Sequence, residues 1–269
     1  MSMLLAAALM VWMGAGASAE LPQELAFLKD LAGDEGPLIE AIRAFDKEQS
    51  ALAEAELGEA AVLQHSGKAD AAIEKHAAAV KRFQLVKQAY EYALKQYRNN
   101  AKAQTYYGEL MYDRFGETAA ALAAWHLAIS LDPKMSAAYN DLAIHYCHEG
   151  EYNQGLRFFD EAIKLEPDNP DYLFNLAQAY LVHVPAVEQY RKWKKPRIYK
   201  EAMKLSEKAT RLDPNDYSLA QDYAMNFYKA EDLQAKPDWK GAAAAWARTR
   251  ALAPGPMEVH NAWLNEARS

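Results

Sequence analysis

The fold is decided by residues 137–169, which read AAYNDLAIHYCHEGEYNQGLRFFDEAIKLEPDN. Apolar side chains recur at helical spacing in both halves of this stretch: Tyr139, Leu142, Ala143 and Tyr146, then Tyr152, Leu156, Phe159, Ala162 and Ile163. Gly150 stands between the two stripes, where the chain must reverse, and Pro167 ends the second stripe because proline cannot continue a helix interior. The stretch therefore predicts a helix, a turn and a second helix, with the small Gly155 allowing the two helices to approach closely.

The same pattern recurs along the second half of the chain. An acidic residue followed by proline ends an apolar stripe at Pro133, Pro167 and Pro214, and a fourth stripe ends at Pro254. The first interval, 167 minus 133, is 34 residues, and a helical repeat of about 34 residues is a known helix-turn-helix unit. The next two intervals are 47 (214 minus 167) and 40 (254 minus 214), so two copies carry extra residues.

These copies resemble the tetratricopeptide repeat family. The resemblance covers four copies: residues 101–134, 136–169, 170–216 and 217–256. It implies an all-α fold, a right-handed superhelical solenoid of helix-turn-helix repeats. It also implies protein binding, because first helices of successive repeats line a concave groove in this family.

The extra residues are expected between the two helices of a repeat, at 182–197 and 230–238. The first insertion reads VHVPAVEQYRKWKKPR and offers five candidate contact residues: Arg191, Lys192, Trp193, Lys194 and Lys195. Interleaved cations and aromatic rings can bind nucleic acid, a glycan or an anionic membrane surface. The alternative, favoured for Trp193, is that the aromatic rings pack back on the solenoid. The second insertion, AEDLQAKPD, shows no feature of its own.

The chain begins with an apolar run that ends in small residues, MLLAAALMVWMGAGASA at positions 3–19. This pattern predicts a signal peptide over residues 1–19, cleaved near Ala19, and an exported protein that is periplasmic or secreted. A retained membrane anchor is the alternative, and the mature form is expected to have no stable membrane span. No Lys or Arg precedes the run, which departs from the usual signal-peptide pattern.

Three further segments complete the expected organisation. Residues 20–50 predict a helical lead-in of two short helices separated near Gly33 to Pro37. Residues 51–100 predict a divergent helical pair with a long second helix, and residues 257–269 predict a capping helix of the kind that repeat stacks need.

Composition limits the classes of function. With 51% hydrophobic residues the chain can bury a large helical core, and a net charge of -7 argues against nucleic acid as the partner. Acidic side chains predominate over residues 20–60 and basic ones over 182–211. Cys147 is the only cysteine, so no intrachain disulfide can form, and burial as a small apolar residue is the favoured interpretation.

The family groove predicts a set of ligand-binding residues on first helices. Their mixture of amide, carboxylate and aromatic groups suits a peptide. The candidates are Glu109, Tyr112, Asn140, Asp141, Ile144, Asp171, Phe174, Asn175, Gln178, Gln221, Asp222, Met225 and Tyr228.

The sequence thus predicts a non-catalytic scaffold or adaptor that binds another protein and has no cofactor. No glycine-rich phosphate loop, HExxH, CxxC or nucleophile elbow occurs. One alternative is an oligomerising component of an envelope assembly, in which the acidic N-terminal helices dock on the basic region of a neighbour. A less favoured alternative is a metal site at His145 and His148, which are three residues apart.

Overall fold

The computed structural model describes residues 21–268, and it contains helices, turns and loops but no strand over that range. The predicted signal peptide lies outside the described residues. The chain divides into two compact units, Met1–Pro133 and Lys134–Ser269, here called the N-terminal and C-terminal units. Each is a stack of helical hairpins, so the all-α repeat fold is confirmed.

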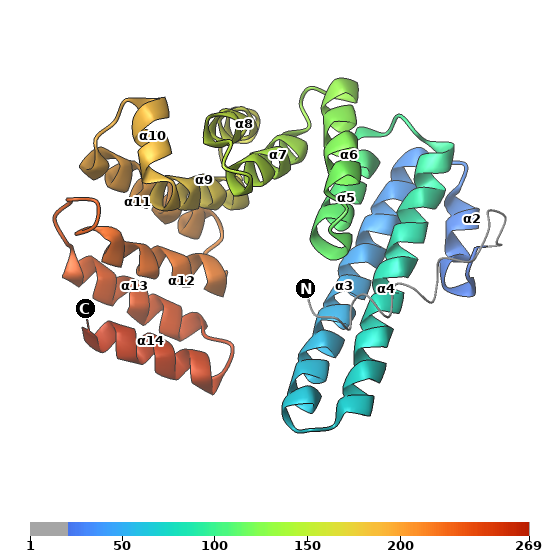
Figure 1. The fold of residues 1–269 in the computed structure, drawn as a ribbon, viewed down its shortest axis with the longest axis horizontal. Helices are drawn as coiled ribbons and strands as arrows, with labels where there is room; N and C mark the ends of the chain where they lie inside the picture. Colours follow the sequence, from blue (N-terminus) through green and yellow to red (C-terminus); the bar gives the residue numbers. More distant parts are fainter. Residues whose placement is uncertain (1–20, 269) are drawn as a thin grey trace. The chain divides into compact units, whose positions relative to one another are not determined.

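The N-terminal unit contains two hairpins (Figure 1). The helices of the first are α3 (Glu35–His65) and α4 (Ala69–Gln96), and those of the second are α5 (Ala101–Leu110) and α6 (Thr118–Leu131). A π turn, η2 (Met111–Phe115), extends α5, while η1 (Gln23–Leu25) and α2 (Phe27–Leu31) precede the first hairpin. Its core is made by apolar side chains of α2, α3, α4 and α5.

One expectation about this unit is corrected. The predicted break near Gly33 to Pro37 exists, but no second short helix ends near residue 50, because α3 continues through this point to His65. Residues 38–65 contain no proline, and alanine, leucine and glutamate are strong helix formers. The expected boundary between 20–50 and 51–100 therefore falls inside one helix.

The C-terminal unit stacks three hairpins and a last helix (Figure 1). The hairpins pair α7 (Ser136–His148) with α8 (Tyr152–Leu165), α9 (Pro170–Val182) with α11 (Lys195–Leu212), and α12 (Tyr217–Asn226) with α13 (Trp239–Leu252). The last helix, α14 (Pro256–Arg268), packs on α13, as predicted for a cap.

The decisive stretch folds as its sequence predicts. Gly150 has a φ of 83°, a left-handed conformation that favours glycine, at the turn between α7 and α8. A Cβ atom on Gly155 would lie 2.5 Å from the Cys147 sulfur and 2.9 Å from the Ala143 carbonyl oxygen. The two helices therefore approach too closely for any larger residue at position 155.

Both insertions lie between the two helices of their repeats. The first forms α10 (Val184–Arg191), which packs against α8, α9 and α11, and α11 begins at Lys195, inside the predicted insertion. The second follows a 3-10 turn, η3 (Phe227–Lys229), and buries Ala230 and Leu233 in the core that contains Tyr199 and Ala202 of α11. In the part of the chain that the structure describes, no helix is both long and apolar enough to cross a membrane.

Candidate interaction surfaces

The first helices of the C-terminal unit bring several predicted groove residues together. The Asn175 side-chain amide of α9 donates to Asn140 Oδ1 of α7 at 3.0 Å. The Asn140 amide in turn donates to Asp141 Oδ1 at 3.4 Å. Asn140 is buried, while Asp141 and Asn175 are half-buried. The buried Asn140 therefore holds the other two side chains, which remain partly accessible to solvent.

Local capping determines where α9 and α12 begin. The Asn169 side chain accepts hydrogen bonds from the backbone N–H groups of Asp171 and Tyr172 at 3.1 and 3.3 Å, and Pro170 occupies the first turn of α9. Asp216 accepts from the Leu219 N–H at 2.7 Å and caps α12. Such caps satisfy backbone donors that have no partner inside the helix.

The Asp216 cap places negative charge beside two predicted groove residues. Desolvation raises the pKa of Asp171, and the charges of Asp216 and Asp213 raise it further. Desolvation also raises the pKa of Asp222, again with Asp216 adding to the effect. Neighbouring carboxylates thus add to the pKa shifts of both residues.

The other predicted residues of α7, α9 and α12 are partly used by the fold. Ile144 and Phe174 are half-buried and pack on neighbouring apolar clusters. Gln178 and Gln221 are half-buried, and Gln178 Nε2 is shielded from solvent without a hydrogen-bond partner among residues 21–268. Met225 is 48% exposed.

Tyr228 lies apart from these residues. Its hydroxyl donates to the Asn265 carbonyl oxygen of α14 at 3.2 Å, and its ring lies 6.2 Å from the Trp239 ring. The predicted stripe assumed one continuous α-helix, but α12 ends at Asn226 and the chain continues as the tighter η3. This change of helical period directs Tyr228 toward the terminal helix.

The two predicted residues of the N-terminal unit are engaged inside that unit. Glu109 pairs with Arg43 of α3 at 2.8 Å. Burial raises the pKa of Glu109, although the Arg43 charge opposes this shift. The Tyr112 ring lies 5.4 Å from the Trp125 ring. Both side chains therefore have structural contacts that the sequence pattern did not indicate.

Most of the first insertion's aromatic and guanidinium groups pack back on the solenoid. The Trp193 ring meets the Tyr180 ring edge-on at 5.8 Å, in agreement with the interpretation favoured from sequence. Arg191 forms an ion pair with Asp160 of α8, and the Tyr190 hydroxyl donates to the same carboxylate at 3.2 Å.

The three lysines of this insertion differ in exposure. Lys192 and Lys194 are exposed and Lys195 is half-buried. Of the five predicted contact residues, Arg191 and Trp193 thus serve the fold, and Lys192 and Lys194 are the two that face solvent most openly.

The predicted histidine pair does not form a cluster of metal ligands. His145 is buried, with its pKa lowered mainly by desolvation, whereas His148 is exposed. No group of three or more His, Cys, Asp or Glu side chains within residues 21–268 could hold a metal ion. Burial raises the pKa of Cys147 to about 11, so its thiol stays protonated at neutral pH.

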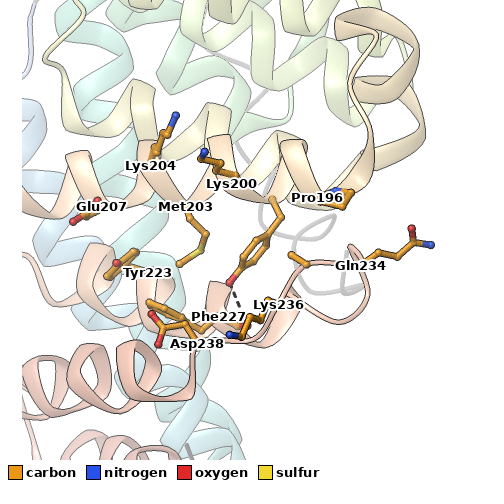
Figure 2. A pocket seen from close by; sticks show the side chains of 12 residues that line it. Pro196, Lys200, Met203, Lys204, Glu207, Tyr223, Phe227, Gln234, Lys236 and Asp238 are labelled. Carbon is orange, nitrogen blue, oxygen red and sulfur yellow. Dashed lines mark hydrogen bonds between the residues drawn. The ribbon is translucent and has the colours of Figure 1, made fainter.

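A surface pocket of about 540 Å³ lies between α11, the end of α12 and the second insertion. Figure 2 shows Met203 of α11 directed toward Tyr223 and Phe227. The Tyr199 hydroxyl donates to the Phe227 carbonyl oxygen at 3.5 Å, and burial raises the pKa of Tyr199 to about 12. The sequence did not predict this pocket, because Leu233, the apolar residue of the insertion, indicated only that the insertion packs on the core.

Comparison with known proteins agrees with this geometry. A family model described as Tetratricopeptide repeat matches residues 158–195, from α8 to the start of α11. The segment from α8 to the start of α11 is therefore similar to a tetratricopeptide repeat. No curated protein sequence matches it.

Several solved structures are similar to this chain. Pseudomonas aeruginosa pilF aligns with a TM-score of 0.53 and 15% identity, over 82% of this chain and 85% of that chain. YrrB, described as a TPR protein with an unusual peptide-binding site, aligns with a TM-score of 0.48 and 20% identity. The alignment covers 68% of this chain and 84% of that chain. MamA aligns with a TM-score of 0.44 and 18% identity, over 63% of this chain and 87% of that chain. At such identities the likeness to pilF concerns the fold alone.

Proposed function

We propose that this chain is a non-catalytic scaffold that binds a polypeptide segment along α7, α9 and α12. The observation that carries the proposal is the hydrogen bond between Asn175 and Asn140, which joins two first helices at 3.0 Å. An asparagine amide can both donate and accept, and the backbone of a peptide presents the complementary groups. With its amide nitrogen held by Asn140, Asn175 keeps its carbonyl oxygen as an acceptor for a ligand N–H.

Gln178 adds a donor on the same helix. Residues 171, 175 and 178 recur at steps of four and three, so they share one face of α9. The Gln178 Nε2 group is shielded from water without a hydrogen-bond partner in the described part of the chain. A buried donor left unpaired costs about 1–3 kcal/mol, and a rotation of the Gln178 side chain that brings this donor to a peptide carbonyl would remove that cost.

The charge of the surface favours a segment that carries lysine or arginine. Asp171 and Asp222 both have raised pKa values, because desolvation and neighbouring carboxylates disfavour their charged forms. A cation placed between α9 and α12 would stabilise both carboxylates. We therefore expect binding to weaken as salt is added, since exposed charge pairs are screened.

The rival role in oligomerisation receives less support. It requires carboxylates of the N-terminal helices to be available to a neighbour. Several of those on α3 already have partners inside the unit: Glu54 pairs with Arg114 at 2.6 Å, and Glu56 with Arg82 at 3.0 Å.

A peptide selection tests the proposal. A random peptide display library is selected against the protein, and the affinity of one selected basic peptide is measured by calorimetry. The substitution Asn175→Ala is expected to lower the affinity for this peptide by about tenfold, because a hydrogen bond in a partly shielded site is lost. The matched control is Asn153→Ala, on the exposed side of α8, which should leave the affinity unchanged. Equal affinities for both variants would overturn the proposal.

A further inference from the structure

The pocket between α11, η3 and residues 230–238 has an apolar floor. Its apolar lining comes from Tyr199, Met203, Tyr223, Phe227 and Ala235. Tyr199 and Phe227 are buried, while Met203 and Tyr223 are half-buried, so this floor is fixed to the core at one side and accessible at the other. Aromatic rings with a flexible methionine form surfaces that adapt to an inserted apolar side chain.

The rim of this pocket is basic. Lys200, Lys204 and Lys236 line it together with Glu207 and Asp238. Lys204 pairs with Glu201 at 3.1 Å, but neither Lys200 nor Lys236 forms an ion pair with any residue from 21 to 268.

One of the pocket's two carboxylates has a structural contact. Asp238 accepts a hydrogen bond from the Gly241 N–H at 2.9 Å and caps α13, so it is committed to the fold. Along α11, Lys200 lies one helical turn after Pro196, and Glu207 lies at the opposite end of the pocket beside Tyr223 (Figure 2). Glu207 therefore lies farther from Pro196 along α11 than Lys200 does.

We infer that this pocket is a second binding surface, and that it accepts an acidic peptide segment anchored by one aromatic side chain. The ring would rest on Met203 and Phe227, and acidic neighbours in the peptide would meet Lys200 and Lys236. A volume of about 540 Å³ falls in the usual range of about 300–1,000 Å³ for ligand pockets. Charge complementarity carries the choice of ligand, because Lys200 and Lys236 line the pocket and neither forms an ion pair with any residue from 21 to 268.

This surface is separate from the proposed peptide site. The proposed site uses Asn175 and Asp222, neither of which lines the pocket. The two surfaces also differ in sign, one favouring basic and the other acidic segments. A scaffold with both surfaces could hold two different segments at once. The experiments on the two surfaces are independent, so one proposal can be refuted while the other stands.

The test uses three fluorescein-labelled peptides and the full chain. The first probe has the sequence Gly-Asp-Glu-Glu-Phe-Glu-Asp-Glu-Gly. The second replaces its phenylalanine with serine, and the third replaces every acidic residue with lysine. Fluorescence anisotropy should show saturable binding of the first probe and binding about tenfold weaker for the second. Any binding of the third probe, which is basic and suits the surface of α9 and α12, should be the same in the unmodified chain and in the Lys200→Glu with Lys236→Glu variant.

Charge reversal locates the binding. The variant Lys200→Glu with Lys236→Glu should bind the first probe with an affinity about tenfold lower, or lower still. The matched control, Lys47→Glu with Lys95→Glu, reverses two exposed lysines of the N-terminal unit and should leave the affinity unchanged. All four positions are exposed, and circular dichroism verifies that each variant folds.

Three outcomes would overturn the inference. The first is no saturable binding of the first probe, and the second is an equal loss in both double variants. The third is self-association of the unmodified chain, measured by light scattering, that the Lys200→Glu and Lys236→Glu variant abolishes. That result would assign the pocket to a second copy of this chain.

Discussion

Substitution Gly155→Ala tests whether α7 and α8 pack as closely as the structure shows. The added Cβ would lie 2.5 Å from the Cys147 sulfur and 2.9 Å from the Ala143 carbonyl oxygen. Real Cβ atoms essentially never approach another heavy atom more closely than 3.0 Å. The sulfur can move only by repacking, because Cys147 is 6% exposed, and the carbonyl oxygen belongs to the backbone of α7. The two helices must therefore separate.

The magnitude follows from two opposing contributions. Overpacking a well-packed core costs about 1–3 kcal/mol, and backbone contact places this site near the upper end. Alanine gains about 1 kcal/mol over glycine in a helix interior. We expect a net loss of about 2 kcal/mol in the free energy of unfolding, from about 3 lost and about 1 gained.

Urea denaturation followed by circular dichroism measures the change. The matched control is Gly58→Ala in α3, where an added Cβ meets nothing within 4 Å, so it should stabilise the protein by about 1 kcal/mol. Adding Cys147→Ala to Gly155→Ala removes the sulfur contact but leaves the carbonyl contact. It should therefore recover part of the loss, with a coupling of about 1 kcal/mol. Gly155→Ala that is as stable as the unmodified protein would refute the close packing.

Three other outcomes can be measured directly. Gly108→Ala should destabilise the N-terminal unit in urea, because its Cβ would lie 2.5 Å from the buried Trp125 ring; unchanged stability would contradict that contact. The pKa of Asp222 is raised above its ordinary 3.8, so the native state loses stability as pH rises through this raised pKa. Asp222→Asn should therefore stabilise the protein at neutral pH and give no gain in stability below pH 3.8, the ordinary pKa of an aspartate. Cys147 should react with thiol reagents only after unfolding, because it is buried with a pKa of about 11. Fast labelling of the native protein would contradict the burial of this thiol.

The repeat period was readable from the sequence because glycine, proline and apolar stripes each act locally. Gly150, Gly155 and Pro167 lie at the turn, the close contact and the helix end that their chemistry predicts. The continuous α3 was not foreseen, since neither Gly58 nor the weak apolar stripe around residue 50 interrupts a helix that packs along α4.

The site was less predictable, because it depends on which partners each side chain finds. A periodic stripe grouped Asp171, Asn175 and Gln178 on one face of α9, but it could not show that Arg43 would pair with Glu109 or Asp160 with Arg191. These partners are 66 (109 minus 43) and 31 (191 minus 160) residues apart. The pocket was missed for the same reason, since Met203 and Phe227 meet only after three helices have packed.

The most direct test of the proposed function follows side-chain amide resonances by NMR while a selected basic peptide is added. We predict that the side-chain amide resonances of Asn175 and Gln178 shift in proportion to bound peptide, and that the resonances of Asn153 on α8 do not. Saturation of binding with no shift at Asn175 or Gln178 would contradict the claim that α7, α9 and α12 hold the polypeptide.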